Sequence, residues 1–351
     1  MDQFVCLRLV QANAIDLSLF QFDYDLTFAV FFMNADKTLY GRFGSRSDQK
    51  EATRDISLEG FCEALGAALE LHRNYPANRG SLAGKQSRPT RFNTPDEYPR
   101  LRGKYQPKLD YEGKVVQSCL HCHQILEAQR SWWRSEHQPV PEEVLYPWPM
   151  PGALGLELDP TAKAKVKRVT QESPAARAGF QPDDELLSLE NQPLLSIADV
   201  QWALHNAPAP ATLQARVQRH HRQLDLTLAL PADWRRHLDI SWRTTTWDLR
   251  RMVTGGLVLK DLPPPARRKA SLSDADLALL VDYVGEYGQH AAGKRAGFRK
   301  DDILVGVEDQ TKRLSESELI GWLLKNRPVG ATVSVDVWRA GERVKLELPM
   351  Q

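Results

Sequence analysis

Residues 173–180 read Ser-Pro-Ala-Ala-Arg-Ala-Gly-Phe in this chain of 351 residues. A predicted strand, Val166–Val169, stands before this octapeptide, and the apolar run 184–189 predicts a second strand after it. The short apolar segment Ala153-Leu154-Gly155-Leu156 precedes both strands. Together these elements predict a compact domain that occupies residues 153–231.

The same domain is predicted to close with a helix, 196–204, and a β-hairpin, 213–230. Roughly 120 residues later the pattern returns, which is the signature of an internal repeat. There the tripeptide Ala-Gly-Phe of residues 296–298 again precedes an apolar strand, a helix and a hairpin. The repeat predicts a second domain, 256–351, which carries a proline-rich insertion at 261–276.

The order and wording of residues 153–231 resemble a PDZ domain of the bacterial periplasmic-protease type. In such a domain a peptide C-terminus adds a strand beside an exposed strand edge, and loop N–H groups hold its carboxylate. The resemblance implies protein or peptide-C-terminus partners, held by a loop and by one helix face. The implied peptide-binding residues are Ala153, Leu154, Gly155, Leu156, Ile197, Val200, Gln201 and Leu204. The repeat, 256–351, resembles the same fold.

Residues 1–76 show a different pattern. Phe4–Val10 predicts a strand, and Leu26–Met33 predicts a stronger one that is covered on both faces. A turn and a return strand, 38–43, complete a hairpin, and the 3.6-residue period predicts a helix from Leu58 to Arg73. This order resembles the second half of a thioredoxin fold, without the half that carries the active-site dithiol. Cys6 and Cys62 lie on apolar faces and are predicted to be buried.

The pentapeptide Cys119-Leu120-His121-Cys122-His123 has the spacing by which c-type haem is attached. His123 would be the proximal iron ligand, with Met150 or His137 as the distal one. A zinc site that uses the two cysteines and nearby histidines is an alternative. A redox dithiol or a structural pair remains open as well.

The segments between these domains are predicted to be connectors. Residues 77–113 read as an extended linker, and 114–152 as a helical segment with the pentapeptide followed by a proline-rich connector. Residues 232–255 alternate Trp with Arg. The predicted fold class is multidomain α/β plus mainly-β: a partial thioredoxin-like domain, 1–76, followed by two PDZ-like domains.

Composition and missing motifs narrow the range of functions that the sequence predicts. The net charge is +1, so nothing favours a nucleic-acid partner. No apolar run approaches the roughly 20 residues of a membrane span. The sequence contains neither Gly-x-Ser-x-Gly nor Gly-Asn-Ser-Gly-Gly, so serine-protease chemistry is not predicted. The chain has no recognisable signal peptide, while the pentapeptide and the PDZ type suggest the periplasm or cell envelope, with the cytoplasm as the alternative.

Taken together, the motifs resemble the thioredoxin-like/PDZ domain-containing (seleno)protein family of planctomycete-type bacteria. The segments that carry this resemblance are 20–36, 119–124, 194–202 and 239–243. The resemblance implies a redox-associated adaptor that binds partners through its PDZ-like domains. Two alternatives stay open: a c-type haem electron-transfer protein, and a thiol or selenol oxidoreductase whose first half lies upstream of this sequence.

Overall fold

The computed structural model describes residues 2–50 and 54–351. The chain forms two compact units. The first unit comprises Met1–Trp132 and Tyr146–Arg235, and the second comprises Trp133–Leu145 and Arg236–Gln351. The predicted connector 114–152 is therefore divided between the two units, and residues 1–76 share a unit with residues 153–231.

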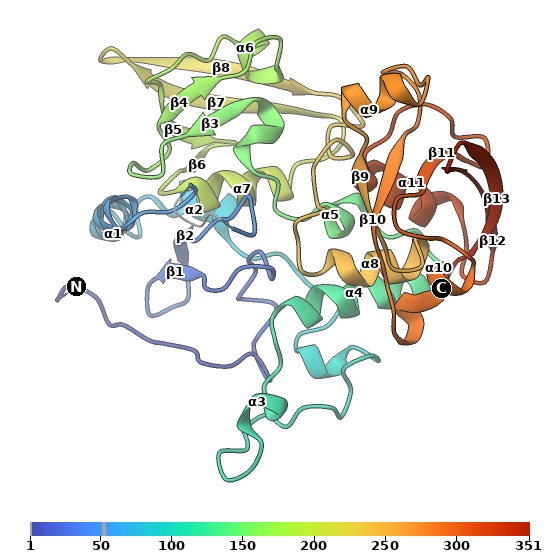
Figure 1. Cartoon of the computed structure of the whole chain (residues 1–351). Helices are drawn as coiled ribbons and strands as arrows, with labels where there is room; N and C mark the ends of the chain where they lie inside the picture. Colours follow the sequence, from blue (N-terminus) through green and yellow to red (C-terminus); the bar gives the residue numbers. More distant parts are fainter. Residues whose placement is uncertain (1, 51–53) are drawn as a thin grey trace. The chain divides into compact units, whose positions relative to one another are not determined.

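Within the first unit, the elements predicted for residues 153–231 are all present (Figure 1). They form a four-stranded antiparallel sheet of order β6-β5-β7-β8 and a separate β3-β4 ribbon. The elements are β3 (Leu156–Leu158), β4 (Val166–Val169), α6 (Pro174–Ala178), β5 (Glu185–Leu189), β6 (Gln192–Pro193), α7 (Ile197–His205), β7 (Ala211–Arg219) and β8 (Arg222–Leu230).

Sequence patterns explain these boundaries. Ser173 caps α6 by accepting the N–H of Ala176, and Gly179 ends it with a φ of 87°. Serine suits the first position because its hydroxyl satisfies a free helical N–H, and glycine suits the last because it adopts positive φ without strain. In β7, buried and exposed residues alternate from Ala211, as expected of a sheet with one face on the core.

The N-terminal part of the first unit confirms the predicted hairpin and helix. Strand β1 (Val30–Met33) pairs antiparallel with β2 (Leu39–Phe43), and α1 runs from Leu58–Arg73 behind an Ser57 cap. These elements pack around a cluster that includes Phe32, Phe43 and Leu195.

Several N-terminal expectations are wrong. Phe4–Val10 forms no strand, and the side chains of Val5 and Leu7 are 91% and 89% exposed. Apolar residues form a strand only where a neighbouring strand takes up their N–H and C=O groups, and β1 pairs with β2 alone among the described strands. The β1 strand is therefore not a covered central strand. Cys6 and Cys62 are exposed for the same lack of a covering layer.

Residues 77–113 are more than a linker, since Leu82, Tyr98 and Leu101 are buried. Their short helices are α2 (Arg79–Leu82), η1 (Ala83–Lys85) and η2 (Pro95–Glu97). The predicted single helix after residue 114 is broken at the pentapeptide. The pieces around this break are α3 (Val115–Ser118), α4 (His123–Ser135), α5 (Glu142–Leu145) and η3 (Pro151–Leu154).

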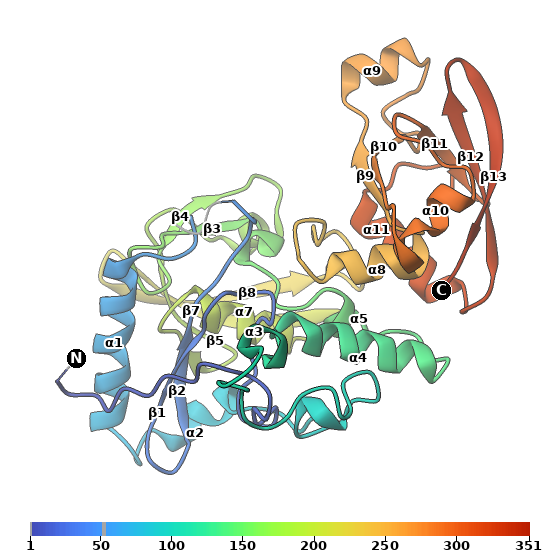
Figure 2. The same ribbon diagram turned by 60° about the horizontal axis from the view of Figure 1, so that its bottom comes forward.

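The second unit repeats the element order of residues 153–231. A five-stranded antiparallel sheet runs in the order β13-β12-β11-β10-β9, and α8 lies against α11 (Figure 2). The elements are α8 (Thr246–Val253), β9 (Leu257–Asp261), α9 (Pro264–Lys269), β10 (Leu279–Val284), η4 (Gly288–Ala291), α10 (Ala292–Arg295), β11 (Ile303–Val307), α11 (Glu316–Asn326), β12 (Thr332–Arg339) and β13 (Glu342–Pro349). Within the described ranges, no helix has the length and apolarity that a bilayer crossing requires.

A buried carboxylate, that of Asp199, joins α7 to the N-terminal part of the first unit. Asp199 lies 2.8 Å from the Lys85 ammonium, and both side chains are 1% exposed. The same carboxylate accepts the backbone N–H groups of Arg42 and Leu195. Burial lowers the pKa of Lys85, and the attraction of Asp199 opposes that shift. The carboxylate therefore satisfies donors from two sequence-distant segments at once.

The Arg42 side chain adds a second tie to the same helix. Its guanidinium stacks 3.8 Å from the centre of the Trp202 ring, and the Trp202 indole N–H donates to the Gly84 carbonyl. Burial lowers the pKa of Arg42 to about 10. A guanidinium over an indole face gains cation–π attraction that is stronger when water is excluded.

We expect Asp199→Ala to destabilise the first unit by about 3–5 kcal/mol, because Lys85 is left as an unpaired buried charge. Urea denaturation of the full chain measures this loss. Asp225→Ala is the matched control, because Asp225 pairs with Arg216 on the exposed surface and should cost less than about 1 kcal/mol. Equal losses in the two variants would contradict the central role of Asp199.

Candidate functional site

The β3 strand has one edge that no described strand covers. β3 pairs only with β4, and the neighbouring bonds run from the Thr170 N–H to the Gly155 carbonyl and from the Asp159 N–H to the Lys165 carbonyl. Backbone groups of alternate residues point to opposite edges of a strand. The N–H and C=O groups of Leu156 and Leu158 therefore point away from β4. We call this side of β3 the open edge because no described strand pairs with it, although Leu156 and Leu158 are themselves 2% and 5% exposed.

The predicted carboxylate loop leads directly into this strand. Its residues form the η3 turn, which ends at Gly155 with a φ of 83°. A side chain at Gly155 would also collide with Ser173, because a Cβ there would lie 2.2 Å from the Ser173 Cβ. Only glycine fits this position. The Gly155 N–H donates to the Gly152 carbonyl, so the Leu156 N–H is the loop donor that faces the open edge.

Helix α7 supplies the predicted second wall. The structure places Leu154, Leu156, Ile197, Val200 and Leu204 in one apolar cluster, each at most 5% exposed, with Ala153 packed against it. The structure thus places residues of the loop and of the helix in one cluster, and their role in peptide binding stays a prediction. These side chains form an apolar and closely packed floor beside the open edge.

Gln201 is also on α7, but its role differs from that of the apolar residues. Its side-chain amide donates to the Trp148 carbonyl at 2.9 Å. The Trp148 ring stacks on His205, with their centroids 4.9 Å apart. Sequence reasoning missed Trp148, which closes the end of the wall nearest the loop. The sequence feature that could have pointed to Trp148 is its position in a proline-rich segment immediately before the loop.

The corresponding edge in the second unit is capped by a side chain. Gly256 has a φ of 84° and leads into β9 as Gly155 leads into β3. In the second unit the Leu259 N–H donates to the Glu316 carboxylate at 2.8 Å. Glu316 is the first residue of α11, the place that Ile197 occupies in α7. An aliphatic side chain cannot accept a hydrogen bond, so the two units differ at this edge.

Arg250 fixes the capping carboxylate. Its Nε and Nη2 donate to the two Glu316 oxygens at 2.9 and 2.6 Å, and another Nη2 bond reaches the Ser241 carbonyl. The Arg250 and Glu316 side chains are 5% and 3% exposed. Bidentate pairing of this kind combines strength with a fixed geometry. The β9 edge is therefore capped at Leu259 by Glu316 of α11, and Arg250 of the Trp/Arg-rich segment holds that carboxylate in place.

The Cys-x-x-Cys-His pentapeptide lies between α3 and α4. Cys119 and Cys122 are free thiols of intermediate exposure, and burial raises the pKa of Cys122. Burial lowers the pKa of His123, and the neighbouring His121 ring, 5.6 Å away between centroids, adds to this effect. The Leu120 N–H donates to the Asn13 side chain, which anchors the loop.

The two proposed axial ligands belong to other parts of the structure than the pentapeptide. Met150 packs against the apolar cluster of α7 and β3, and His137 belongs to the second unit. Over residues 2–50 and 54–351, no three His, Cys, Asp or Glu side chains are grouped to hold a metal ion. Haem c and zinc therefore remain predictions that rest on the spacing of Cys119, Cys122 and His123 alone.

Comparison with known proteins identifies the class of the first site. Residues 152–230 match the PDZ domain family model. The chain is similar to a probable periplasmic serine endoprotease DegP-like protein of Pseudomonas putida (strain W619), with 26% identity over 52% of this chain and 37% of the relative. It is also similar to the periplasmic pH-dependent serine endoprotease DegQ of Escherichia coli (strain K12), with 25% identity over 55% of this chain and 38% of the relative.

The chain spans little more than a third of the length of these curated relatives. Similar solved structures include a serine endoprotease from Yersinia pestis, with 26% identity, a TM-score of 0.18 and coverage of 19% of this chain and 25% of the other. Another is an HtrA-type protease AlgW with tripeptide, with 17% identity, a TM-score of 0.23 and coverage of 35% and 38%. The chain therefore contains a PDZ domain, and its curated relatives are periplasmic endoproteases.

We expect the Arg250→Met/Glu316→Leu double variant to release the Leu259 amide. Hydrogen exchange at that amide should accelerate about fivefold, because the loss of one hydrogen bond costs about 1 kcal/mol. The double change removes both charges, so no unpaired buried ion remains to unfold the unit.

The control is Glu318→Ala, two residues further along α11. Glu318 caps the helix through Ser315 and pairs with His237, and it does not contact Leu259. Exchange at Leu259 should stay at the wild-type rate in this variant. Unchanged exchange in the double variant would show that Glu316 does not cap the β9 edge.

Proposed function

We propose that this protein is a peptide-binding adaptor whose binding site is the open edge of β3 in the first unit. A single contrast carries the proposal: the edge of β9 is capped by Glu316, while the equivalent wall of the first unit presents the aliphatic Ile197. Strand edges with free N–H and C=O groups attract a further strand. The PDZ domain class uses this mode of recognition.

The ligand is a free peptide C-terminus with an apolar last residue. The last residue is proposed to be apolar because the cluster beside this edge, which includes the fully buried Leu154, Val200 and Leu204, is apolar. The Leu156 N–H, which follows the left-handed Gly155, faces the place of the carboxylate. β3 is only Leu156–Leu158 long, so about three ligand residues pair with it.

The N-terminal part of the first unit limits the ligand at its other end. The Ser57 hydroxyl at the start of α1 donates to the Pro160 carbonyl, two residues beyond β3. A Cβ on Gly60 would lie 2.1 Å from the same carbonyl oxygen, so α1 abuts this segment closely. Residues of the ligand further from its C-terminus leave the groove near α1.

The proposed role is binding rather than proteolysis. The chain carries a PDZ domain but neither of the serine-protease motifs sought in its sequence. Its curated relatives are periplasmic, and we propose the periplasm or cell envelope as its compartment. A redox association of the adaptor, through the Cys119 and Cys122 thiols of the same unit, is the finer part of the proposal.

Fluorescence anisotropy of the full chain with labelled heptapeptides tests the proposal. The peptides differ only in the last residue, which is Ala, Val, Leu or Phe, and each is made with a free carboxylate and as the amide. We expect the free-carboxylate forms to bind and the amides to bind at least about tenfold more weakly, because charge-assisted bonds are the stronger ones. Equal binding of both forms would exclude C-terminus recognition.

Ile197→Gln places an acceptor where Glu316 stands in the second unit. We expect it to weaken peptide binding about tenfold, because the amide oxygen competes for the Leu158 N–H. Val116→Gln is the matched control, since Val116 is 73% exposed on α3, away from α7 and α1 in sequence. A peptide that binds both variants equally well does not use the edge of β3.

A further inference from the structure

The apolar cluster beside the open edge of β3 is closed to a ligand in this structure. Leu154, Val200 and Leu204 are fully buried, and the edge residues Leu156 and Leu158 are almost so. A peptide side chain therefore reaches this cluster only after some part of the chain moves aside.

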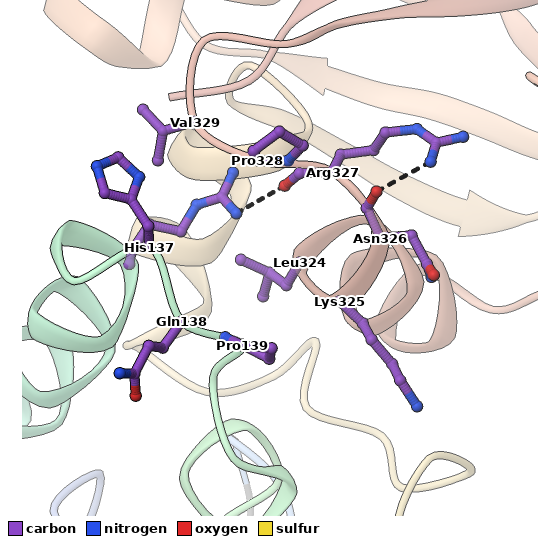
Figure 3. A pocket seen from close by; sticks show the side chains of 10 residues that line it. His137, Gln138, Pro139, Leu324, Lys325, Asn326, Arg327, Pro328 and Val329 are labelled. Atoms are coloured by element: carbon purple, nitrogen blue, oxygen red, sulfur yellow. Dashed lines mark hydrogen bonds between the residues drawn. The ribbon is translucent and has the colours of Figure 1, made fainter.

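A cavity in the second unit shows the contrast with a hollow that is accessible. Its volume is about 180 Å³, and its lining includes His137, Gln138, Pro139 and residues 324–329 (Figure 3). The side chains of His137 and Lys325 at its rim are exposed, whereas Leu204 at the end of α7 is buried. This cavity is open without any rearrangement, and the site at β3 is not.

Trp148 lies against α7 directly before the predicted carboxylate loop, and it is 6% exposed. Its ring stacks on the His205 ring, with centroids 4.9 Å apart and planes 12° from parallel. The centroid of the Trp202 ring lies 5.7 Å away. An aromatic ring of the chain itself thus fills the space beside the C-terminal end of α7.

The backbone of Trp148 binds the same helix. The Gln201 side-chain amide donates to the Trp148 carbonyl at 2.9 Å, and the Trp148 N–H donates to Nδ1 of His205 at 3.4 Å. Ile197, Gln201 and His205 follow one another at intervals of four residues, so they lie along one face of α7. Ile197 and Gln201 are also predicted to bind the peptide. The chain therefore holds its own segment where the sequence predicts the ligand.

The backbone conformation of Trp148 is unfavourable by itself. Its φ is 51°, which is uncommon for a bulky residue. Pro149 follows it, and a residue before proline favours extended conformations. The contacts with α7 have to compensate for this local cost, which lowers the free energy needed to release the segment.

Trp148 is also close in sequence to the loop that leads into β3. Only Pro149 and Met150 separate it from the η3 turn, and this turn packs on α7. Met150 packs against the apolar cluster. Release of the Trp148 ring from His205 therefore frees the end of α7 and loosens the approach to the Leu156 N–H together.

On the basis of the proposed peptide-binding function, we propose that Trp148 is an internal occupant of the site, which the aromatic last side chain of a peptide ligand replaces. The entering ring takes over the stacking on His205 and the contact with Trp202. The ligand backbone accepts the Gln201 amide in place of the Trp148 carbonyl. An aromatic last residue is preferred because an aliphatic side chain cannot stack on the imidazole.

Competition by Trp148 has a measurable consequence. A protein whose binding-competent form is only partly populated binds its ligand more weakly by that fraction. Removal of the Trp148 ring should therefore tighten the binding of a peptide that needs the space of the ring. A peptide that ends in alanine needs little of that space and should gain little.

Fluorescence anisotropy of the full chain tests this with the free-carboxylate heptapeptides that end in Phe and in Ala. We expect Trp148→Ala to bind the Phe peptide at least about tenfold more tightly than the wild type does, and the Ala peptide less than about threefold more tightly. Equal affinity of the two proteins for the Phe peptide, or an equal gain for both peptides, would refute the replacement of Trp148 and leave peptide binding intact. No binding by either protein would overturn the proposed function and this inference together.

Trp234→Ala is the matched control. Trp234 is 5% exposed and belongs to the apolar cluster of the same unit, but its indole N–H donates to the Pro208 carbonyl. This variant also loses a buried indole, and it should bind the Phe peptide no more tightly than the wild type does. Equal tightening in Trp148→Ala and Trp234→Ala would reduce the effect to a general loosening of the unit and contradict the proposal.

Hydrogen exchange of the wild type tests the same step without any variant, so it holds even if Trp148→Ala does not fold. Saturating Phe peptide should accelerate exchange at the Trp148 amide about fivefold or more, because its hydrogen bond to His205 is lost. Exchange at the Leu156 amide should slow, because the peptide carboxylate accepts that N–H. Slower exchange at Leu156 with no acceleration at Trp148 would show that the peptide binds without displacing Trp148.

Discussion

The backbone of a strand edge must find hydrogen-bond partners, and this requirement organises both units of the protein. In the second unit the requirement is met internally, because the Glu316 carboxylate accepts the Leu259 N–H and is itself held by Arg250. In the first unit the wall of α7 offers Ile197 at that place, and a hydrocarbon cannot do the same. One side-chain difference thus separates an edge whose N–H is hydrogen-bonded within its own unit from an edge for which no described strand or side chain at that place supplies an acceptor.

The position of that open edge depends on contacts far from it in sequence. Asp199, one turn into α7, accepts N–H groups from Arg42 and Leu195 and pairs with Lys85. Trp202, on the same side of the helix, lies beneath the Arg42 guanidinium. The opposite side of the helix carries Val200 and Leu204 into the core beside β3. Helix α7 is therefore held by the N-terminal part on one face and packs into the core beside β3 with another.

The sequence predicted the local elements of residues 153–231 well, because alternation in the strands and the glycine at 155 follow from backbone sterics. It also predicted α1 correctly, from its 3.6-residue period. It failed for Phe4–Val10, since an apolar run does not reveal whether a partner strand exists. It could not foresee that Lys85, in a stretch that reads as a linker, would be buried against Asp199. Such long-range ion pairs leave no periodic signal.

The candidate site likewise combines features that could be predicted from the sequence with features that could not. The apolar wall residues Ile197, Val200 and Leu204 could be predicted from helical spacing, and they lie with the loop as expected. The capping role of Glu316 could not, because it depends on which atoms β9 and α11 bring within 2.8 Å of each other. The pentapeptide at Cys119 gave the strongest sequence pattern, yet Met150 packs in the core cluster of α7 and β3, and His137 belongs to the other unit. Spacing specifies a chemical possibility, and packing decides which groups meet.

Because α7 contacts both the N-terminal part and the core beside β3, attachment of the β1–β2 hairpin and binding of a ligand at β3 are energetically linked. A ligand that binds only the folded form raises the free energy of unfolding in proportion to the logarithm of its concentration over its dissociation constant. Since Asp199 ties the β1–β2 hairpin to the same helix, detachment of that hairpin must work against the bound ligand as well. By reciprocity, any contact that stabilises the attached hairpin also raises the affinity for that ligand. The N-terminal part thus contributes to the energetics of the proposed site mainly through α7.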